Sequence, residues 1–319
     1  MPDISYDFPT PTVSGQSITV QWLQADPRRI YRLLNTLVQR YLIGHKVLAG
    51  RVNLTGTGTA VYEIAESIVA DLSSATVPPL TEYPLSAMTP GTLAVIKPLK
   101  DGLDSLISDE DIAHNRIDKV MRDLVKIANT LVLKSDGLTM AAVASQVTQT
   151  QAVQAGAWNV STANPFLDVM LAKAAIIGQN KGYNPDIAVM TFTEFAWVVS
   201  RSVILQGVPR ETADNIIATG NMVRIGGMTY LATNNLQGGN PLVADSTMLG
   251  SLAWEDLGGG YQGSAAPPDA NDDNPTSSGV QTKRMREDDV DGVRYRGRLV
   301  RAPMVQEPGA GCFITGTLV

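Results

Sequence analysis

The stretch of residues 51–96 most constrains the fold of this chain, because it is long and has few large apolar side chains. Gly56, Gly58 and nearby threonines predict a turn, and residues 59–65 and 80–85 predict the arms of a long hairpin. Its distal part, around residues 73–79, is rich in small residues and proline. A lone hairpin is only marginally stable in water, so this one needs a partner surface on its own chain or on a neighbouring copy.

A long helix is the second constraint. Ser108, followed three residues later by Asp111, forms a variant capping box, and the acids at 109–111 suit the positive end of a helix. One apolar stripe follows at helical spacing: Ile117, Val120, Met121, Leu124, Ala128 and Leu131. We expect a helix over residues 108–135, stopped by Gly137, with a length of about 40 Å.

The chain before this hairpin predicts an arm and a first helix. Residues 1–25 are polar, contain several prolines and show little periodicity. Asp26 as N-cap and Pro27 at the first helical position open a helix that ends near Gly44. Four of its surface positions are basic: Arg28, Arg29, Arg32 and Arg40.

The second half of the chain predicts a mixed α/β block. We expect helices over 164–179 and 193–202, and strands over 186–191, 222–232, 241–246 and 251–256. Residues 258–279 have low complexity and very few β-branched or large apolar residues, which predicts a mobile surface loop. A hairpin with strands over 280–287 and 293–301 follows, and the last strand covers 312–318.

Composition excludes several classes of protein. The net charge of −6 argues against the chain-wide basic surface of many nucleic-acid-binding proteins. Cys312 is the single cysteine, so no intramolecular disulfide forms. His45 and His114 are too few and too far apart for a histidine-based metal site, and no stretch is apolar and long enough to cross a bilayer. We expect a protein made in a cytoplasm, with no metal, cofactor or membrane contact.

Motifs of catalysis are missing from the sequence. It contains no nucleophile elbow, zinc-protease pair, phosphate-binding loop, dinucleotide-binding loop or Cys-x-x-Cys pair. Residues 287–292 resemble the opening of a calcium loop, but the twelfth position is Arg298 rather than Glu, so the pattern fails. A charged hairpin turn is the interpretation we prefer, and we expect no enzyme active site.

Four stretches, in this order, resemble the major capsid proteins of tailed bacteriophages, which share the Hong Kong 97-like fold. The first is Glu82-Tyr83-Pro84 in the long hairpin, and the second is Leu106-Ile107-Ser108-Asp109-Glu110 at the start of the long helix. The third is the strand and helix over 186–200. The fourth is the charged hairpin and apolar strand over 285–316. The resemblance runs from about residue 26 to the end of the chain.

The resemblance implies an α+β fold of five consecutive parts. They are an N-terminal arm and helix (1–48), an E-loop hairpin (49–97), a peripheral domain with the long spine helix (98–154), an axial α/β domain that carries the mobile insert 258–279 (155–279), and the C-terminal strands of the peripheral domain (280–319).

The resemblance also implies a function. Such a chain self-assembles as pentamers and hexamers into an icosahedral shell that encloses double-stranded DNA, and it assembles in the cytoplasm of the bacterial host before it resides in the virion. The implied partners are other copies of itself, a scaffold protein, a portal, a decoration protein where one binds, and packaged DNA through non-specific contacts.

Two alternatives stay open. An encapsulin-type compartment would use the same fold but hold protein cargo instead of DNA. An α/β enzyme of unknown chemistry would have a deep polar cleft and a small oligomeric state. A phage tail-tube protein is disfavoured, because a β-rich tube subunit has no need of the long helix and the α/β block.

Candidate contact residues come from the hairpin, the last strands and the first helix. We expect assembly to bury Val61, Ile64, Leu80, Tyr83 and Leu85 of the hairpin. Arg294, Arg296 and Arg298 alternate along one strand and share a face, which contacts acids of a neighbouring subunit, DNA or solvent. The basic face of the first helix, with Arg28, Arg29, Arg32 and Arg40, docks scaffold protein, faces the genome, or is the solvent side of an ordinary amphipathic helix.

The long hairpin has no lysine between Arg51 and Ile96; the flanking lysines are Lys46 and Lys97. Some members of the resembled family cross-link covalently through a lysine of this loop to an asparagine. We therefore predict no such cross-link at the loop tip. Mature particles boiled in detergent should run as a single monomer band on a denaturing gel, and a ladder of covalent oligomers would contradict the prediction.

Overall fold

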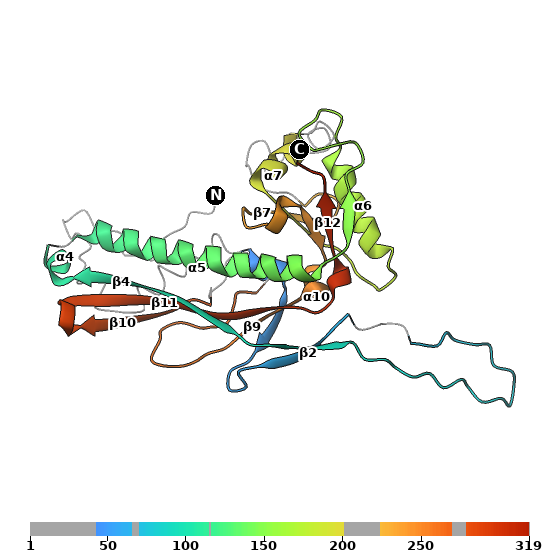
Figure 1. The fold of residues 1–319 in the computed structure, drawn as a ribbon, viewed down its shortest axis with the longest axis horizontal. Coiled ribbons are helices and arrows are strands. Elements are labelled where there is room, and N and C mark those ends of the chain that lie inside the picture. Colours follow the sequence, from blue (N-terminus) through green and yellow to red (C-terminus); the bar gives the residue numbers. More distant parts are fainter. Residues whose placement is uncertain (1–42, 66–69, 115, 201–223, 270–278, 319) are drawn as a thin grey trace.

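The computed structural model of the chain describes residues 43–65, 70–114, 116–200, 224–269 and 279–318. Figure 1 shows an elongated layered part, a second lobe above one end of it, and a long hairpin that projects from the other side. The predicted arm over 1–25 and the first helix, with Arg28, Arg29, Arg32 and Arg40, lie outside the described residues.

The layered part is a helix on a five-stranded sheet (Figure 1). The sheet consists of β10 (Gln281–Glu287), β11 (Gly292–Val305), β4 (Leu99–Ser108), β9 (Gly250–Trp254) and β1 (Gly50–Asn53). Strand β11 is antiparallel to β10 on one side and to β4 on the other, and its last residues pair with β9. The predicted C-terminal hairpin is confirmed, with η2 (Asp288–Val290) in its turn.

Helix α5 (Ile117–Gln146) covers one face of this sheet. Its predicted stripe is buried against β11 in one core: Val120, Leu124, Ile127, Leu131, Val293, Tyr295 and Leu299. Gly297 lies directly under the helix, since a Cβ there would stand 2.8 Å from Cγ2 of Ile127. The two layers therefore pack at a distance that only glycine permits at this position.

The predicted single helix over 108–135 is wrong in two respects. Ser108 does cap a helix, because its Oγ accepts a bond from the backbone N of Asp111 at 3.4 Å, but that helix is the short α4 (Asp109–Ala113). Helix α5 then runs past Gly137 to Gln146. A glycine inside a helix costs only roughly 0.5–1 kcal/mol, and burial of Met140 and Val143 in the second lobe offsets it.

The second lobe holds another five-stranded sheet, in the order β5 (Thr150–Ala152), β12 (Gly311–Thr315), β8 (Leu242–Ala244), β6 (Ile187–Met190) and β7 (Thr229–Ala232). The helices beside it are α6 (Pro165–Ile177), α7 (Phe192–Ser200) and α10 (Ser246–Leu249). Short 3-10 turns, η1 (Gln237–Gly239) and η3 (Pro308–Ala310), precede β8 and β12. The predicted helices of this block and its strands over 186–191 and 241–246 are confirmed, and the strand expected over 222–232 is shorter. The strand expected over 251–256 forms as β9, but it belongs to the sheet of the layered part rather than to this block.

The long hairpin pairs differently from the prediction. Strand β2 (Ala60–Ile64) is antiparallel to β3 (Thr92–Ile96), with Val61 opposite Val95. Residues 80–85, expected to be the second arm, form no strand. Proline offers no N–H to a strand ladder, and Pro78, Pro79 and Pro84 lie in or beside that segment.

The described part of the predicted surface loop over 258–279 packs on the body of the chain. Ala265 is buried, and Gln262 forms an antiparallel bridge with Thr282. Nε of Arg51 also donates to the carbonyl of Pro268 at 3.0 Å. Polar bonds to the backbone thus dock the segment on the sheet although it has few large apolar side chains. Residues 270–278 lie outside the described part of the chain.

A buried polar cluster lies where the two parts meet. Helix α3 (Gly44–Val47) is capped by Asp136 of α5, whose carboxylate accepts bonds from the backbone N of Ile43 and of Gly44. Arg301 of β11 is 4 % exposed and donates to Oγ of Ser135 at 3.1 Å. His45 is 2 % exposed, inside α3 rather than after the end of a helix as predicted.

Burial moves the pKa values of this cluster in opposite directions. Desolvation lowers the pKa of His45 to about 3, and the charges of Lys46, Arg301 and Arg51 act in the same direction. Desolvation raises the pKa of Asp136 to about 6, against the bonds from Gly44 and Ile43 and the charge of Arg301. Desolvation also lowers the pKa of Arg301 to about 10.

These shifts predict compensating pH effects on stability. Below pH 6.5 the unfolded chain protonates His45 and the folded chain does not, so the free energy of unfolding falls by about 1.4 kcal/mol per pH unit. Asp136, whose ordinary value is 3.8, takes up its proton in the folded chain first, so it has the opposite slope between about pH 6 and pH 4.

Replacing either His45 or Asp136 should reveal how the other residue makes the free energy of unfolding depend on pH. We expect Asp136→Asn to lose about 2–3 kcal/mol relative to the native chain between pH 6 and pH 4, and His45→Gln to gain a similar amount. Urea denaturation at both pH values measures this. The double variant is the control and should parallel the native chain, whereas single variants with the native pH slope would contradict the prediction.

Candidate functional site

The β2–β3 hairpin has two different faces. Its inner face packs on the body of the chain, where Ala60, Tyr62 and Ile96 contact a small core of Leu54, Ala253, Ala302 and Met304. Its outer face, formed by the cross-strand pairs Val61–Val95 and Glu63–Leu93, is exposed. Val61 is 65 % and Val95 70 % exposed, although β-branched residues in strands are usually half-buried.

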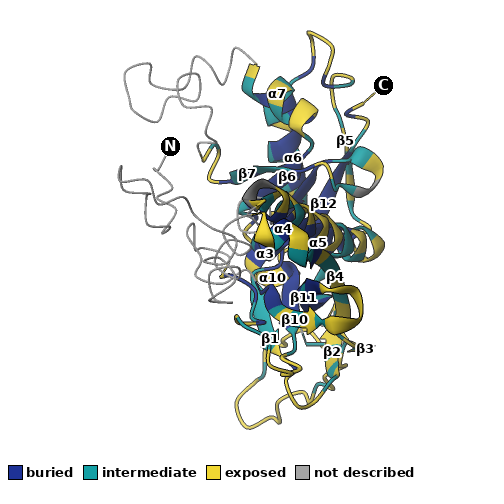
Figure 2. Ribbon diagram, turned by 90° about the vertical axis from the view of Figure 1, so that its left-hand side faces the viewer, coloured by how far each residue is buried: buried dark blue, intermediate teal, exposed yellow. Residues whose placement is uncertain are grey.

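Beyond β2 and β3 the hairpin continues as an exposed extension, over residues 70–91 in the described part (Figures 1 and 2). Large apolar side chains are exposed along it: Leu72, Leu80, Tyr83, Leu85 and Met88. Only a few polar bonds tie its sides together, such as Oγ1 of Thr89 to Oδ2 of Asp71 at 2.6 Å. The extension therefore presents apolar surface without a core of its own.

Leu80 lies in the turn of this extension. Oγ1 and the backbone N of Thr81 both donate to the carbonyl of Pro78, and Leu80 between them has φ 65°. The left-handed region costs a residue with a Cβ roughly 1–2 kcal/mol. The chain thus holds a fully exposed leucine in a strained turn, which is the arrangement expected where function rather than local stability selects the conformation.

The five hairpin residues predicted to make contacts fall into two groups, four that are exposed and one that is half-buried. Val61, Leu80, Tyr83 and Leu85 are exposed, as a contact buried only on assembly requires. Ile64 lies on the inner face and is half-buried by its own chain. Its neighbour Ala65 donates its backbone N to the carbonyl of Gln306 at 2.9 Å, which fixes this end of β2 to the body.

The three predicted arginines of β11 do share one sheet face, the face away from α5, but their partners come from the same chain. Arg296 binds Asp104 of β4 with two bonds, Nε–Oδ1 at 2.7 Å and NH2–Oδ2 at 2.6 Å. Arg294 reaches the same carboxylate at 3.3 Å and Glu287 at 3.0 Å. The bonds and charge of Arg296 hold the pKa of Asp104 below its usual range.

Arg298 is 7 % exposed. Its NH2 donates to Oε1 of Gln281 at 2.6 Å and to the carbonyl of Gly258 at 3.0 Å. Its guanidinium also lies 3.6 Å from the ring centre of Tyr261, in a cation–π contact. Arg298 is thus held by β10 and the 258–268 segment of its own chain, and a role of these arginines between subunits stays a prediction.

Sequence reasoning missed strand β4 and therefore its Asp104. The alternation was present: Ser105 and Ile107 face α5, whereas Asp104 and Leu106 face the other side. Gly102 in this strand weakens the local signal for it, because glycine is depleted in strand interiors.

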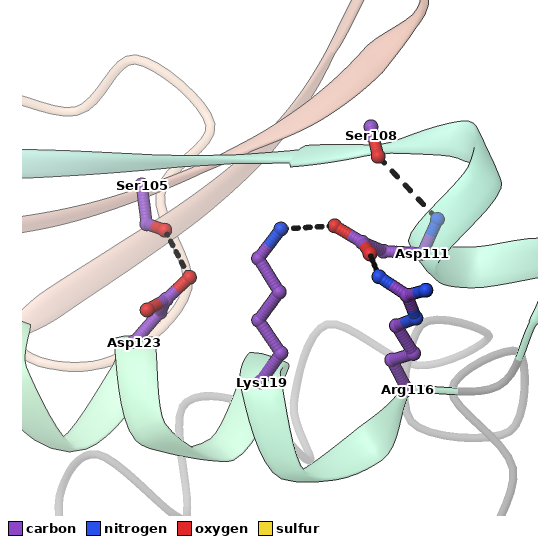
Figure 3. A network of polar contacts seen from close by, with 6 residues as sticks. All are labelled: Ser105, Ser108, Asp111, Arg116, Lys119 and Asp123. Carbon is purple, nitrogen blue, oxygen red and sulfur yellow. Dashed lines mark hydrogen bonds and ion pairs between the residues drawn. The ribbon is translucent and has the colours of Figure 1, made fainter.

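A polar network joins the ends of α4 and α5 (Figure 3). Asp111 is buried and pairs with Arg116 at 3.1 Å and with Lys119. The bond to Lys119 holds the pKa of Asp111 below its usual range. In the next turn of α5, Asp123 accepts a bond from Oγ of Ser105 at 3.3 Å. The network fixes the turn through which β4 enters the long helix.

The acidic turn over 287–292 forms a β-hairpin end, as expected. Arg286 binds Asp109 at 2.5 Å and Asp288 at 3.0 Å across it. Within the described residues, no group of three His, Cys, Asp or Glu side chains could hold a metal ion. Cys312 is buried, and burial raises the pKa of its thiol to about 11. None of the described helices is long and apolar enough to span a membrane.

Comparison with known proteins places these features in a family. The family model "Phage capsid protein" matches residues 92–313, well over half of the chain. No curated protein matches the chain.

Solved structures share the fold at low identity. The chain is similar to a protein of Microbacterium phage Oxtober96, with a TM-score of 0.57 and 12 % identity over 86 % of this chain and 90 % of that one. It is also similar to the capsid of Cyanophage P-SCSP1u (TM-score 0.54, 14 % identity, 97 % and 93 % covered). A virus-like particle from Pyrococcus furiosus is similar too (TM-score 0.56, 11 % identity, 90 % and 98 % covered).

The match and the shared α+β architecture agree with the resemblance that the sequence stretches indicated. The chain therefore belongs to the phage capsid protein family, a family of viral structural proteins, and has the Hong Kong 97-like fold of tailed-phage major capsid proteins.

Proposed function

We propose that this chain self-assembles as pentamers and hexamers into the icosahedral shell that encloses the double-stranded DNA genome of a tailed phage. The observation that carries the proposal is the hairpin, whose outer face and extension expose large apolar side chains. These side chains add no stability to an isolated monomer. Packing of another copy against them would contribute a free energy of roughly 1.5–3 kcal/mol for each side chain fully buried.

In this proposal the parts of the chain have the roles that the resemblance implies. Residues 49–97 are the E-loop, and 98–154 and 280–319 form the peripheral domain around α5, except for β5 and β12, which pair in the sheet of the second lobe. Residues 155–279 form the axial domain at the centres of pentamers and hexamers, except for β9, which pairs in the sheet of the layered part. Residues 1–48 are the N-terminal arm. The chain assembles in the cytoplasm of the bacterial host with a separate scaffold protein and a portal, and it resides in the virion. A decoration protein binds the finished shell where one exists.

The acceptor surface for the hairpin is proposed on β4. This strand pairs with β11 on one side only among the described residues. It exposes Leu99, Leu103 and Leu106 along its length. An exposed edge strand with apolar side chains is a ready partner for apolar segments of another chain. Contact between the hairpin of one copy and β4 of the next would bury the exposed apolar side chains of both.

An encapsulin-type compartment is the second candidate, and the similarity to the virus-like particle from Pyrococcus furiosus favours it. The contents of the particle distinguish the two functions. Particles purified from cells that express the chain with its neighbouring genes are imaged by negative-stain microscopy and then extracted. Nucleic acid inside supports the phage shell, a uniform protein cargo supports the compartment, and the absence of closed particles contradicts both.

The hairpin contacts can be tested with charges on the outer face. We expect the pair Val61→Lys and Val95→Lys to leave the subunit folded, because both side chains are exposed, and to reduce particle yield at least tenfold, because assembly would bury two charges. The control places the same charges on exposed positions of α6, Leu167→Lys and Ile177→Lys.

Thermal unfolding of the isolated subunit and particle counts from sedimentation measure the two effects. A folded subunit that yields normal particles would remove the hairpin from the assembly contacts. Deletion of residues 67–79 tests the extension in the same way, with the same expected loss of particles.

A further inference from the structure

The solvent side of α5 carries a row of cations that the proposed assembly contacts do not involve. The row, here called the basic stripe, consists of Arg116, Lys119, Arg122, Lys126 and Lys134. All five are exposed, and every exposed charged side chain that the structure describes on α5 is basic. At 3.6 residues per turn the five positions fall within an arc of roughly 120°, opposite the residues buried on the sheet.

The two acids of α5 whose side chains the structure describes make contacts within the chain. Asp123 is half-buried and accepts a bond from Ser105 of β4. Asp136 is 1 % exposed and caps α3. The described acids of α5 therefore serve contacts inside the chain, while its bases face outward. This division gives one side of the helix a net positive charge although the whole chain has a net charge of −6.

Three members of the stripe have no partner in the described part of the chain. Arg116 and Lys119 pair with Asp111 at the start of the helix (Figure 3). The side chains of Arg122, Lys126 and Lys134 make no hydrogen bond or ion pair to any described residue. On β11, by contrast, Asp104 and Glu287 together balance the charges of Arg294 and Arg296. Unpaired positive charge is thus gathered along the helix, whereas these two arginines of the sheet are paired.

We propose that the basic stripe of α5 is a phosphate-binding surface that lies against packaged double-stranded DNA, so that this side of the layered part faces the interior of the shell. The inference rests on the proposed function, since it names the genome as the partner. A duplex carries about one phosphate charge per 1.7 Å of its axis, and the stripe spans about 22 Å from Lys119 to Lys134 on a rigid helix.

The chemistry of the stripe favours DNA over a protein partner. Between Lys119 and Lys126 its exposed surface has no large apolar side chain, and Leu133 is the one exposed apolar residue near its end. A docked protein segment usually buries an apolar centre, whereas phosphate contacts need only cations at reachable spacing. Contacts of this kind carry no sequence information, which suits a shell that must accept any part of a genome.

The test replaces the three unpartnered cations, Arg122→Gln, Lys126→Gln and Lys134→Gln, in the full chain. The control removes the same charge elsewhere, with Lys97→Gln, Lys100→Gln and Lys181→Gln. Binding of a random-sequence duplex of about 30 base pairs is titrated at several salt concentrations, because each neutralised phosphate contributes about 0.9 to the salt slope.

We expect the stripe variant to bind DNA with a salt slope smaller by about 2 to 3. Between 50 and 200 mM salt the native chain should then lose about 16- to 64-fold more affinity than the variant, and the control should behave as the native chain. Equal slopes in all three proteins would overturn the inference, and so would equal losses in variant and control, which indicate an effect of net charge alone.

Particle formation with the neighbouring genes separates this inference from the proposed function. If the variant forms closed particles that retain less DNA, both stand. If it forms particles with native DNA binding, the inference fails and the proposed function stands. If DNA binding is native but assembly is lost, the stripe docks an acidic protein segment instead, and the inference is overturned.

Discussion

The packing of α5 on β11 is the interaction on which the rest of the structure depends. Strand β11 pairs with β10, β4 and β9, which come from three distant segments of the chain. The helix covers this strand so closely that Gly297 is needed beneath it. Both α5 and β11 then lead into the second lobe, through Val143 and Val147 on one side and η3 on the other. Two separate connections therefore fix the lobe against the layered part, as a subunit that must keep its shape in a lattice requires.

The sheet is covered by α5 on one face only, and its other face carries polar side chains that need hydrogen-bond partners. The arginines of β11 do this within the chain, through Asp104, Gln281 and the 258–268 segment. Arg51 works in the same way at the base of the hairpin, where its guanidinium donates to the carbonyls of His45, Leu48 and Pro268. These bonds position the hairpin without a large apolar core under it. The cost of ordering an arginine is offset because one planar group meets several acceptors at once.

Much of this fold could be predicted from periodicity, and the failures have physical causes. The stripe of α5, the α/β lobe and the C-terminal hairpin follow from local spacing. The pairing of β2 with β3 could not be found, because the two strands are separated by a long extension and register depends on contacts across it. The course of α5 through Gly137 depends on burial of Met140, which no local preference encodes. Partners such as Asp104 for Arg296 are non-local, so the sequence identified the charged face but not what neutralises it.

An exposed apolar hairpin is an aggregation hazard, and the chain limits that hazard locally. The strands β2 and β3 are only five residues each, and Glu63 places a charge beside Val61 and opposite Leu93 on the outer face. Prolines in the extension prevent it from forming a longer ladder that could template aggregation. What remains is a set of separate apolar side chains, each able to contribute a modest contact. Because a closed shell repeats each contact many times, modest contacts suffice for stability, and they also let misplaced subunits dissociate before an error is enclosed.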